Sequence, residues 1–256
     1  MSLRLTVLGS GTSHGIPMIG CDCAVCTSDD PRDKRTRTSV VFSYDEHNIL
    51  VDTPPELRLQ CIAQDIRRAD AILFTHFHAD HIAGLDDVRR FNWIQGGPIT
   101  LYGDRPTLQE LRQTFAYAFV DDPEYPSAKP ELDAVALDGP IELFGRQIIP
   151  IPLMHGPQPV FGFRVGKIAY CTDCNLIPDD SRKLLRNLDI LVLDAVRRRP
   201  HATHFNLEQA VEEARRIGAK HTYFTHIAHE LKHAETNAEL PPGMELAYDG
   251  LVCISD

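Results

Sequence analysis

The chain contains the stretch Phe74-Thr75-His76-Phe77-His78-Ala79-Asp80-His81 at the end of a short apolar run. That run predicts a buried strand over Ala71–Thr75, followed by a turn and a helix. Four of the last six positions carry imidazole or carboxylate groups, which are ligands that divalent first-row metals accept. Two histidines one residue apart can face one ion as the chain leaves the strand, while Asp80 and His81 can face a second ion from the first helical turn. Solvated histidines at a polar strand end are the alternative, but they do not explain so dense a cluster.

Apolar runs and helical periodicity alternate along the rest of the chain, which indicates an α/β fold with sheets covered by helices around one core. Strands are predicted at Leu3–Leu8, Ser39–Tyr44, Asn48–Asp52, Ala71–Thr75, Ile99–Tyr102, Ile148–Leu153, Phe161–Cys171, Ile190–Leu193 and His221–Thr225. Helices are predicted at Pro55–Gln64, Leu85–Trp93, Thr107–Phe119 and Leu207–Ile217. The segment Asp121–Asp133 holds three prolines and five acidic residues, which is typical of an exposed loop or lid.

Composition narrows the class of protein. The 256 residues are 43% hydrophobic and 24% charged, as in an ordinary globular protein, and the formal net charge is −10. Sequence-independent binding of nucleic acid requires Lys and Arg to neutralise phosphates, so nucleic acid is an unfavourable partner for this chain. The apolar runs are far shorter than the roughly 18 residues that span a bilayer. No signal-peptide pattern opens the sequence, and we therefore expect a cytoplasmic protein without a membrane partner.

The HxHxDH motif of His76–His81 resembles the signature of the metallo-β-lactamase superfamily. This resemblance implies an αββα four-layer sandwich with the site at the sheet edges, formed by residues 1–256 as a single hydrolase domain. The metal ligands that follow this motif in the superfamily have counterparts here in the segments PLMHG, AYCTDC and YFTHIAH. The implied ligands are His76, His78 and His155 for one metal, Asp80, His81 and His226 for the other, and Asp173 as the bridge. Taken alone, His155 can also be interpreted as a hydrogen-bonded core histidine.

A cluster of three cysteines, Cys21, Cys23 and Cys26, follows a Gly-rich segment near the N-terminus. Three thiolates lack the fourth ligand that a tetrahedral structural zinc requires. Within the superfamily, this loop resembles that of the PhnP phosphodiesterases of the carbon–phosphorus lyase pathway. There, a histidine three residues after the last catalytic-metal histidine completes the zinc site, and His229 has that position here. The alternatives are three reduced cysteines without a metal and a surface histidine.

The same resemblance implies catalytic roles for Asp80 and for His204, which precedes the helix predicted to begin near Leu207. His204 would act as the general acid, and His201 is its nearby competitor. Two divalent ions bring a charge of +4, which the two carboxylates of the ligand set reduce to about +2, and such a centre suits the anionic transition state of phosphate-diester cleavage. The water shared by the two metals would have a lowered pKa and serve as the nucleophile, while a protonated His204 would donate to the leaving alkoxide.

These features predict a metal-dependent phosphodiesterase that hydrolyses a small phosphate diester. The resemblance implies 5-phosphoribosyl 1,2-cyclic phosphate as the substrate. The expected cofactors are two catalytic divalent metals, Mn²⁺ or Zn²⁺, and one structural Zn²⁺. Two alternatives stay open: an endonuclease of tRNA 3′ ends, which shares the metal motif, and a non-hydrolytic metal-dependent accessory protein. Dimers are the commonest closed assembly, so a homodimer is among the states left open.

Overall fold

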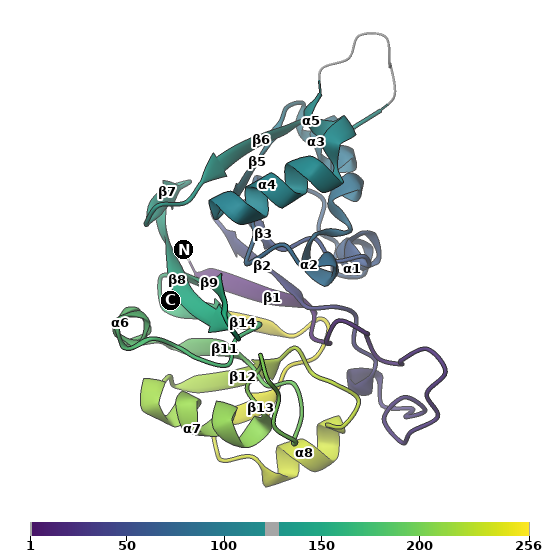
Figure 1. Cartoon of the computed structure of the whole chain (residues 1–256), viewed down its shortest axis with the longest axis vertical. Coiled ribbons are helices and arrows are strands. Elements are labelled where there is room, and N and C mark those ends of the chain that lie inside the picture. Colours follow the sequence, from purple (N-terminus) through teal and green to yellow (C-terminus); the bar gives the residue numbers. More distant parts are fainter. Residues whose placement is uncertain (1, 121–127, 256) are drawn as a thin grey trace.

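The computed structural model describes residues 2–120 and 128–255. Two seven-stranded sheets pack face to face, and helices cover the outer face of each (Figure 1). This arrangement confirms the expected αββα sandwich. The first sheet has the spatial order β14 (Val252–Ser255), β1 (Leu3–Gly9), β2 (Ser39–Tyr44), β3 (His47–Val51), β4 (Ala71–Leu73), β5 (Ile99–Gly103) and β6 (Leu132–Ala136). The second has the order β13 (Met244–Leu246), β12 (His221–Thr225), β11 (Ile190–Asp194), β10 (Ile168–Cys171), β9 (Gln158–Val165), β8 (Arg146–His155) and β7 (Ile141–Leu143).

The helices fall into two groups that follow the order of the chain (Figure 1). Those beside the first sheet are α1 (Leu57–Ala63), α2 (Ala79–Ile82), α3 (Arg89–Gln95), α4 (Arg105–Thr114) and α5 (Ala116–Phe119), with the 3₁₀ turn η2 (Leu85–Val88). Those beside the second are α6 (Asp179–Leu184), α7 (Leu207–Ile217) and α8 (His233–Glu239). A further 3₁₀ turn, η1 (Pro31–Asp33), lies in the long loop after β1.

Side-chain alternation along the strands divides the core into three layers. Phe42 and Tyr170 point between the two sheets, whereas their neighbours Val41 and Cys171 point outward into the two clusters beneath the helices. Strands that are buried on both faces need apolar residues at nearly every position, because neither face meets water. This explains why β10 (IAYC) and the centre of β2 (Val40–Phe42) are continuous apolar runs in the sequence rather than alternating ones.

Parallel pairing gathers the functional segments at one edge. In the first sheet β3, β4, β5 and β6 run parallel, and in the second β10, β11, β12 and β13 do so. The carboxyl ends of parallel strands meet at the same edge of a sheet, where α/β folds place their ligand sites. The segments after β4, β10 and β12 carry the residues His76–His81, Asp173 and His226, and Asp80 and His81 already belong to α2.

The structure corrects several of the predicted elements. The single strand expected over Phe161–Cys171 is instead two antiparallel strands, β9 and β10, because the chain turns at Gly166 with a φ of +52°. The helix expected over Thr107–Phe119 breaks at Phe115 into α4 and α5. Of the loop expected over Asp121–Asp133, residues 121–127 lie outside the described part of the chain, and its last two residues already belong to β6.

Other elements were not predicted. The strands β6, β7, β13 and β14 and the helices α6 and α8 are all short, and their sequences carry little periodicity. Within residues 2–120 and 128–255, no helix has the length and apolar character needed to cross a membrane.

Candidate functional site

Seven side chains converge at the sheet edge in two groups that share one carboxylate. In each group all the potential ligand atoms lie within 4.8 Å of one another. The first group is His76, His78, His155 and Asp173, and the second is Asp80, His81, Asp173 and His226. The structure therefore brings together all seven side chains that the sequence analysis proposed as ligands of the two catalytic metals, and Asp173 belongs to both groups.

Three of these imidazoles present a buried nitrogen that has no hydrogen-bond partner among the described residues: Nε2 of His76, His81 and His226. Their distances to the nearest Asp173 oxygen are 3.8, 3.4 and 3.4 Å, which are too long for good hydrogen bonds. Buried polar atoms are almost always satisfied, and an unsatisfied one costs about 1–3 kcal/mol. Three such atoms aimed at one carboxylate fit a site for divalent cations.

A buried carboxylate orients His81 from the side opposite the site. Its Nδ1 lies 2.7 Å from Oδ2 of Asp52. The same carboxylate accepts the backbone N–H of Thr75 at Oδ1 and the hydroxyl of Thr75 at Oδ2, both at 2.9 Å. Because an ionised carboxylate can only accept, His81 must donate from Nδ1, which directs Nε2 toward the site. Such contacts fix the tautomer and the ring orientation of a metal-ligating histidine.

The protonation of the site matches what metal binding requires. Burial lowers the pKa of His76 well below its usual range and also lowers the pKa values of His78 and His155, so these rings are neutral. Burial disfavours a proton on His81 as well, but three nearby carboxylates, among which Asp173 has the largest effect, raise its pKa well above the usual value. A cation bound among the carboxylates would take the place of that proton.

His155 is held by the backbone. Its Nδ1 lies 2.9 Å from the carbonyl oxygen of Thr203, which can only accept, so the proton sits on Nδ1 and Nε2 is the free ligand atom. If His155 were only a hydrogen-bonded core histidine, the contact of Nδ1 would be explained but Nε2 would have no function. The same segment places His204, whose ring centroid lies 4.6 Å from that of His155.

His204 and Asp194 form a second carboxylate–histidine pair, with Nδ1 and Oδ2 3.0 Å apart. Burial lowers the pKa of His204, but the charge and hydrogen bond of Asp194 outweigh it and raise the pKa to about 9. The ring also stacks on His226 with centroids 4.5 Å apart. The competitor His201 lies farther out, 4.9 Å from His204 between centroids, and burial lowers its pKa. His204 is thus the protonated imidazole beside the two metal-binding groups.

Three residues of this site have strained backbone conformations. Asp52, Asp173 and His226 all adopt left-handed φ angles, of +65°, +51° and +58°. Such conformations are uncommon for residues other than glycine and cost about 1–3 kcal/mol each. Hydrogen bonds around these residues, such as those that Asp52 accepts from Thr75, offset part of this cost.

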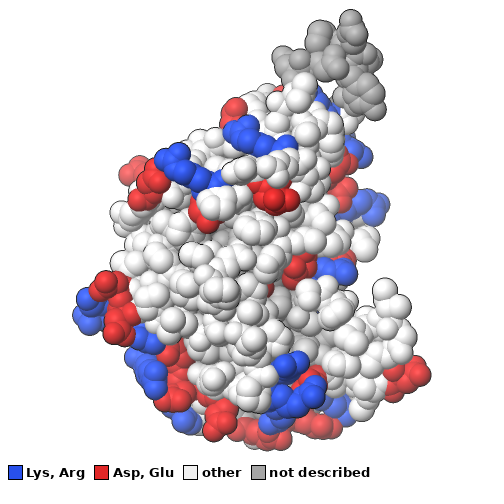
Figure 2. Space-filling model, in the orientation of Figure 1, with Lys and Arg blue, Asp and Glu red and all other residues white. Residues whose placement is uncertain are grey.

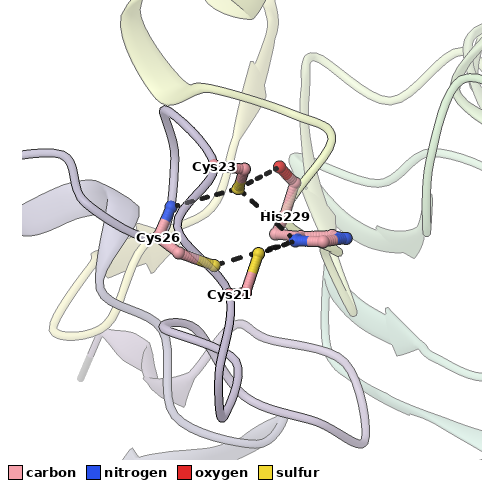
Figure 3. A group of neighbouring side chains, drawn as sticks. All are labelled: Cys21, Cys23, Cys26 and His229. Atoms are coloured by element: carbon pink, nitrogen blue, oxygen red, sulfur yellow. Dashed lines mark hydrogen bonds between the residues drawn. The ribbon is translucent and has the colours of Figure 1, made fainter.

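The three cysteines and His229 form a separate group (Figure 3). The sulfur atoms of Cys21, Cys23 and Cys26 lie 3.2, 3.5 and 3.7 Å from Nδ1 of His229. The backbone N–H of Cys26 donates to the sulfur of Cys23 and lowers the pKa of that thiol to about 6. Burial raises the pKa of Cys26 to about 11, so three thiolates can coexist here only with a cation among them. The donor set of three sulfurs and one nitrogen matches tetrahedral structural zinc.

A buried ion pair joins the two metal-binding regions. Arg35, which is 1% exposed, pairs with Asp33 at 3.2 Å and donates from its other terminal nitrogen to the carbonyl of Leu231 at 3.1 Å. Asp33 accepts the backbone N–H of His233 at 2.8 Å. These contacts hold the segment 226–233, which carries His226 of one region and His229 of the other.

Two carboxylates of this site, Asp52 and Asp194, were not identified from the sequence. Each directly follows a buried strand, β3 in one case and the last apolar residue of β11 in the other. A single aspartate at the carboxyl end of a parallel apolar strand was the available signal, since such ends line the site. It was weaker than the histidine motif because one carboxylate also fits a turn or a helix cap.

Comparisons with known proteins agree with this geometry. The family described as the beta-lactamase superfamily domain matches residues 47–227. A crystal structure of a diphosphatase from the PhnP family superposes with a TM-score of 0.94 and 47% identity, covering 100% of this chain and 98% of the other. The octanoyltransferase of Porphyromonas gingivalis is 35% identical over 99% of this chain, which spans about half (52%) of that protein's length. Ribonuclease Z of Clostridium kluyveri is 42% identical over 62 residues, 23% of this chain and 20% of that protein.

The family match covers well over half of the sequence and includes the HxHxDH motif, His155, Asp173 and His226. The histidine and aspartate clusters within it have the donor chemistry that divalent metals require. The chain therefore belongs to the metallo-β-lactamase superfamily and is a metal-dependent hydrolase of that fold.

Proposed function

We propose that the protein is a phosphodiesterase that hydrolyses a small phosphate diester, such as 5-phosphoribosyl 1,2-cyclic phosphate. The observation that carries the proposal is the convergence of unpaired, buried Nε2 atoms on Asp173 beside the protonated His204. A cationic centre next to a proton donor suits a reaction that gathers negative charge on phosphoryl oxygens and expels an alkoxide.

The proposed roles of the metal-binding side chains follow the two groups. His76, His78 and His155 hold one divalent metal, Asp80, His81 and His226 hold the other, and Asp173 bridges them. When bound, the two ions would supply Lewis-acid polarisation of the phosphoryl group and lower the pKa of water at the site. Asp80 and Asp173 keep the net charge of this centre near +2, which favours an anionic substrate. Cys21, Cys23, Cys26 and His229 hold a structural zinc.

His204 is the proposed general acid. Asp194 fixes the ring through Nδ1, so the proton available to the substrate is the one on Nε2. Asp194 also offsets the charge of the imidazolium and keeps it protonated at neutral pH. Stacking against His226 restricts rotation of the ring, which keeps the donor beside the metal-binding groups.

The surface favours a compact substrate over a folded RNA. The net charge is −10, and on the face shown in Figure 2 basic side chains are interspersed with acidic ones rather than forming a stripe. Binding of RNA along its backbone depends on a row of Lys and Arg that neutralises several phosphates. The similarity to ribonuclease Z covers only 23% of this chain, so we treat tRNA processing as the weaker proposal.

A diphosphate ester is a second candidate substrate, because the 47% identical structure is that of a diphosphatase. A diphosphate and a phosphate diester both present a tetrahedral phosphorus between two bridging oxygens. They differ in the leaving group, since a phosphate leaves readily without a proton whereas an alkoxide needs one. A proton donor such as His204 is needed when an alkoxide leaves but not when a phosphate leaves. Its presence at the site therefore favours the diester as the substrate.

The test compares substrates on one preparation of the Mn-loaded protein at fixed, modest salt. We expect hydrolysis of bis-aryl phosphates and of cyclic ribose phosphates, poor processing of precursor tRNA, and no turnover of a β-lactam. A nucleoside diphosphate ester is included in the same series. Precursor tRNA cleaved with a kcat/KM far above that of every small substrate would refute the proposal and favour the endonuclease. No turnover of any of these substrates by the metal-loaded protein would favour the accessory-protein alternative.

A further inference from the structure

The side chain of Asn175, in the segment after β10, connects two other segments that each carry a residue of the site. Its Oδ1 accepts the backbone N–H of Gly156 at 2.9 Å, and its Nδ2 donates to the carbonyl oxygen of Ala202 at 2.9 Å. Gly156 directly follows the proposed metal ligand His155, and Ala202 lies two residues before the proposed general acid His204. One amide therefore links the segment of a metal ligand to the segment of the proton donor.

An amide matches both partners of this contact. A backbone N–H can only donate and a carbonyl oxygen can only accept, so the group between them needs one acceptor and one donor. An aspartate would keep the hydrogen bond from Gly156 but would place its second oxygen against the carbonyl oxygen of Ala202. The main chain of Asn175 is itself held, because its N–H donates to the carbonyl of Met154 on β8 at 2.9 Å.

The segment 201–204 belongs to no helix or strand and is held by contacts from other segments. The carbonyl of Thr203 lies 2.9 Å from Nδ1 of His155. Gly156 has a φ of +60° and packs so closely that a Cβ there would lie 2.8 Å from Cγ2 of Thr203. Together with the hydrogen bond from Asn175 to this segment, these contacts hold it against the end of β8.

We propose that Asn175 is a positioning residue, which holds the segment 201–204 so that the imidazole of His204 reaches the leaving group beside the metal-binding groups. This inference rests on the proposed role of His204 as the general acid. Asp194 orients the ring through Nδ1, whereas Asn175 fixes the main chain that precedes it. Misplacement of a catalytic group by about 1 Å can cost roughly 100-fold in rate. Loss of Asn175 should therefore impair proton donation rather than metal binding.

The first experiment measures how Asn175→Ala changes the dependence on the leaving group. We expect kcat on an alkyl diester to fall roughly 10–100-fold with little change in KM. An aryl diester needs less proton donation, so its kcat should fall far less. Both catalytic metals should remain bound, as elemental analysis can show. Asn175→Asp, which loses the donor to Ala202 and keeps the acceptor for Gly156, should show the same selective loss.

Asn92→Ala is the matched control. Nδ2 of Asn92, on α3, likewise joins two segments, through the carbonyl oxygens of Gly97 and Glu131, both at 2.9 Å. Its loss should lower the thermal midpoint without changing the ratio of alkyl to aryl rates. Equal slowing of both diesters by Asn175→Ala, or an unchanged ratio in that variant, overturns the proposal.

A double-mutant cycle tests whether Asn175 acts through His204. Residues that act through one group have effects that do not add. In a His204→Ala background, Asn175→Ala should therefore slow the alkyl diester no further. The full additional loss in that background would mean that Asn175 acts independently of the general acid and would overturn the proposal.

Hydrogen exchange without substrate separates this inference from the proposed function. The N–H of Phe205 donates to the carbonyl of Cys174 at 2.8 Å, so its exchange reports whether the segment before it stays in place. Loss of one hydrogen bond changes an opening equilibrium roughly 2–10-fold, and we expect faster exchange by that factor in Asn175→Ala but not in Asn92→Ala. Faster exchange in a protein that cleaves no diester would refute the substrate and support the anchoring by Asn175. Unchanged exchange would overturn the inference even in an active phosphodiesterase.

Discussion

Nδ1 of His204 lies 3.0 Å from Oδ2 of Asp194, and Oδ1 of the same carboxylate lies 3.8 Å from Nδ1 of His226. One aspartate at the end of β11 therefore faces both the proposed general acid and a proposed metal ligand. The group that keeps His204 protonated therefore also faces the ring of His226. This relationship leads to a prediction about pH.

Asp194→Asn should move the alkaline limit of activity to lower pH. The acid form of His204 is the active one, so activity of the wild-type protein should fall as the pH rises through about 9. Without the aspartate charge, burial lowers the pKa of His204 and the fall should begin at least one unit earlier. The measurement is the pH profile of kcat/KM on an alkyl diester. Asp189→Asn, at a partly exposed carboxylate paired with Lys220, is the control, and an unchanged alkaline limb in Asp194→Asn would contradict the assignment.

His204→Ala should separate substrates by their leaving groups. We expect diesters with alkoxide leaving groups to slow by roughly 10²–10⁴, whereas aryl diesters, which need less proton donation, should slow far less. Both catalytic metals should remain bound, as elemental analysis can show. His201→Ala is the matched control one turn away and should have a small effect. Equal slowing of both substrate types would make His204 a positioning residue.

Asp173→Asn should abolish metal binding and activity together. The asparagine side chain preserves shape and tolerates the left-handed φ of +51° at this position, so the fold should persist while the bridging charge is lost. Metal content, activity and the thermal midpoint measured on one preparation check this. Asp179→Asn, at a fully exposed carboxylate, should change none of the three. Two metals retained in Asp173→Asn would refute the bridging role.

Cys23→Ser should remove about one zinc per chain and lower the thermal midpoint. Wild-type protein should hold about three metals, one of which resists mild chelation. The chain that still folds should keep a metallated catalytic centre, because none of the three cysteines belongs to either catalytic group. Cys61→Ser is the control for zinc content, since that cysteine is a buried residue of α1 and lies away from the cluster. Unchanged zinc content in Cys23→Ser would exclude the structural site.

Asp52→Asn should weaken catalytic metal binding without changing the reaction at saturating metal. The substitution removes the charge that fixes the tautomer of His81, and loss of such an orienting contact typically costs 10–100-fold in metal affinity. The measurement is activity against metal concentration. We expect kcat to recover at high metal, and a kcat that stays low would mean that Asp52 acts on the chemistry itself.

The sequence analysis predicted the structure best where several metal-binding residue types lie close together in the chain. His76, His78, Asp80 and His81 fall within six residues, and their pattern after an apolar strand indicated both the fold and the metal-binding region. The geometry around Asp173 follows from the parallel strands that bring distant segments to one edge. The local pattern was enough to locate the metal-binding region because each of these residues is of a type that binds metal ions, and the ends of parallel strands are where such sites form.

The sequence was uninformative where tertiary contacts decide the structure. Edge strands such as β6 and β14 are four or five residues long, and pairing with a neighbour rather than their own periodicity makes them strands. Gly166 divides the long run after Phe161, but a glycine within a strand pattern also fits a bulge. Arg35 resembles an ordinary surface arginine in the sequence, and only the fold shows that it is buried.

The segment 226–233, held by the buried Arg35–Asp33 pair, has a consequence for how the enzyme would be supplied with metals in a cell. It carries one residue for each kind of site, so the thiolate-bound ion would add a second anchor to the stretch that bears His226. Soft thiolates select zinc, while the histidine and carboxylate centre accepts harder ions such as manganese. A zinc-starved cell would then hold less folded hydrolase even with abundant manganese, so its total activity would report on the zinc supply.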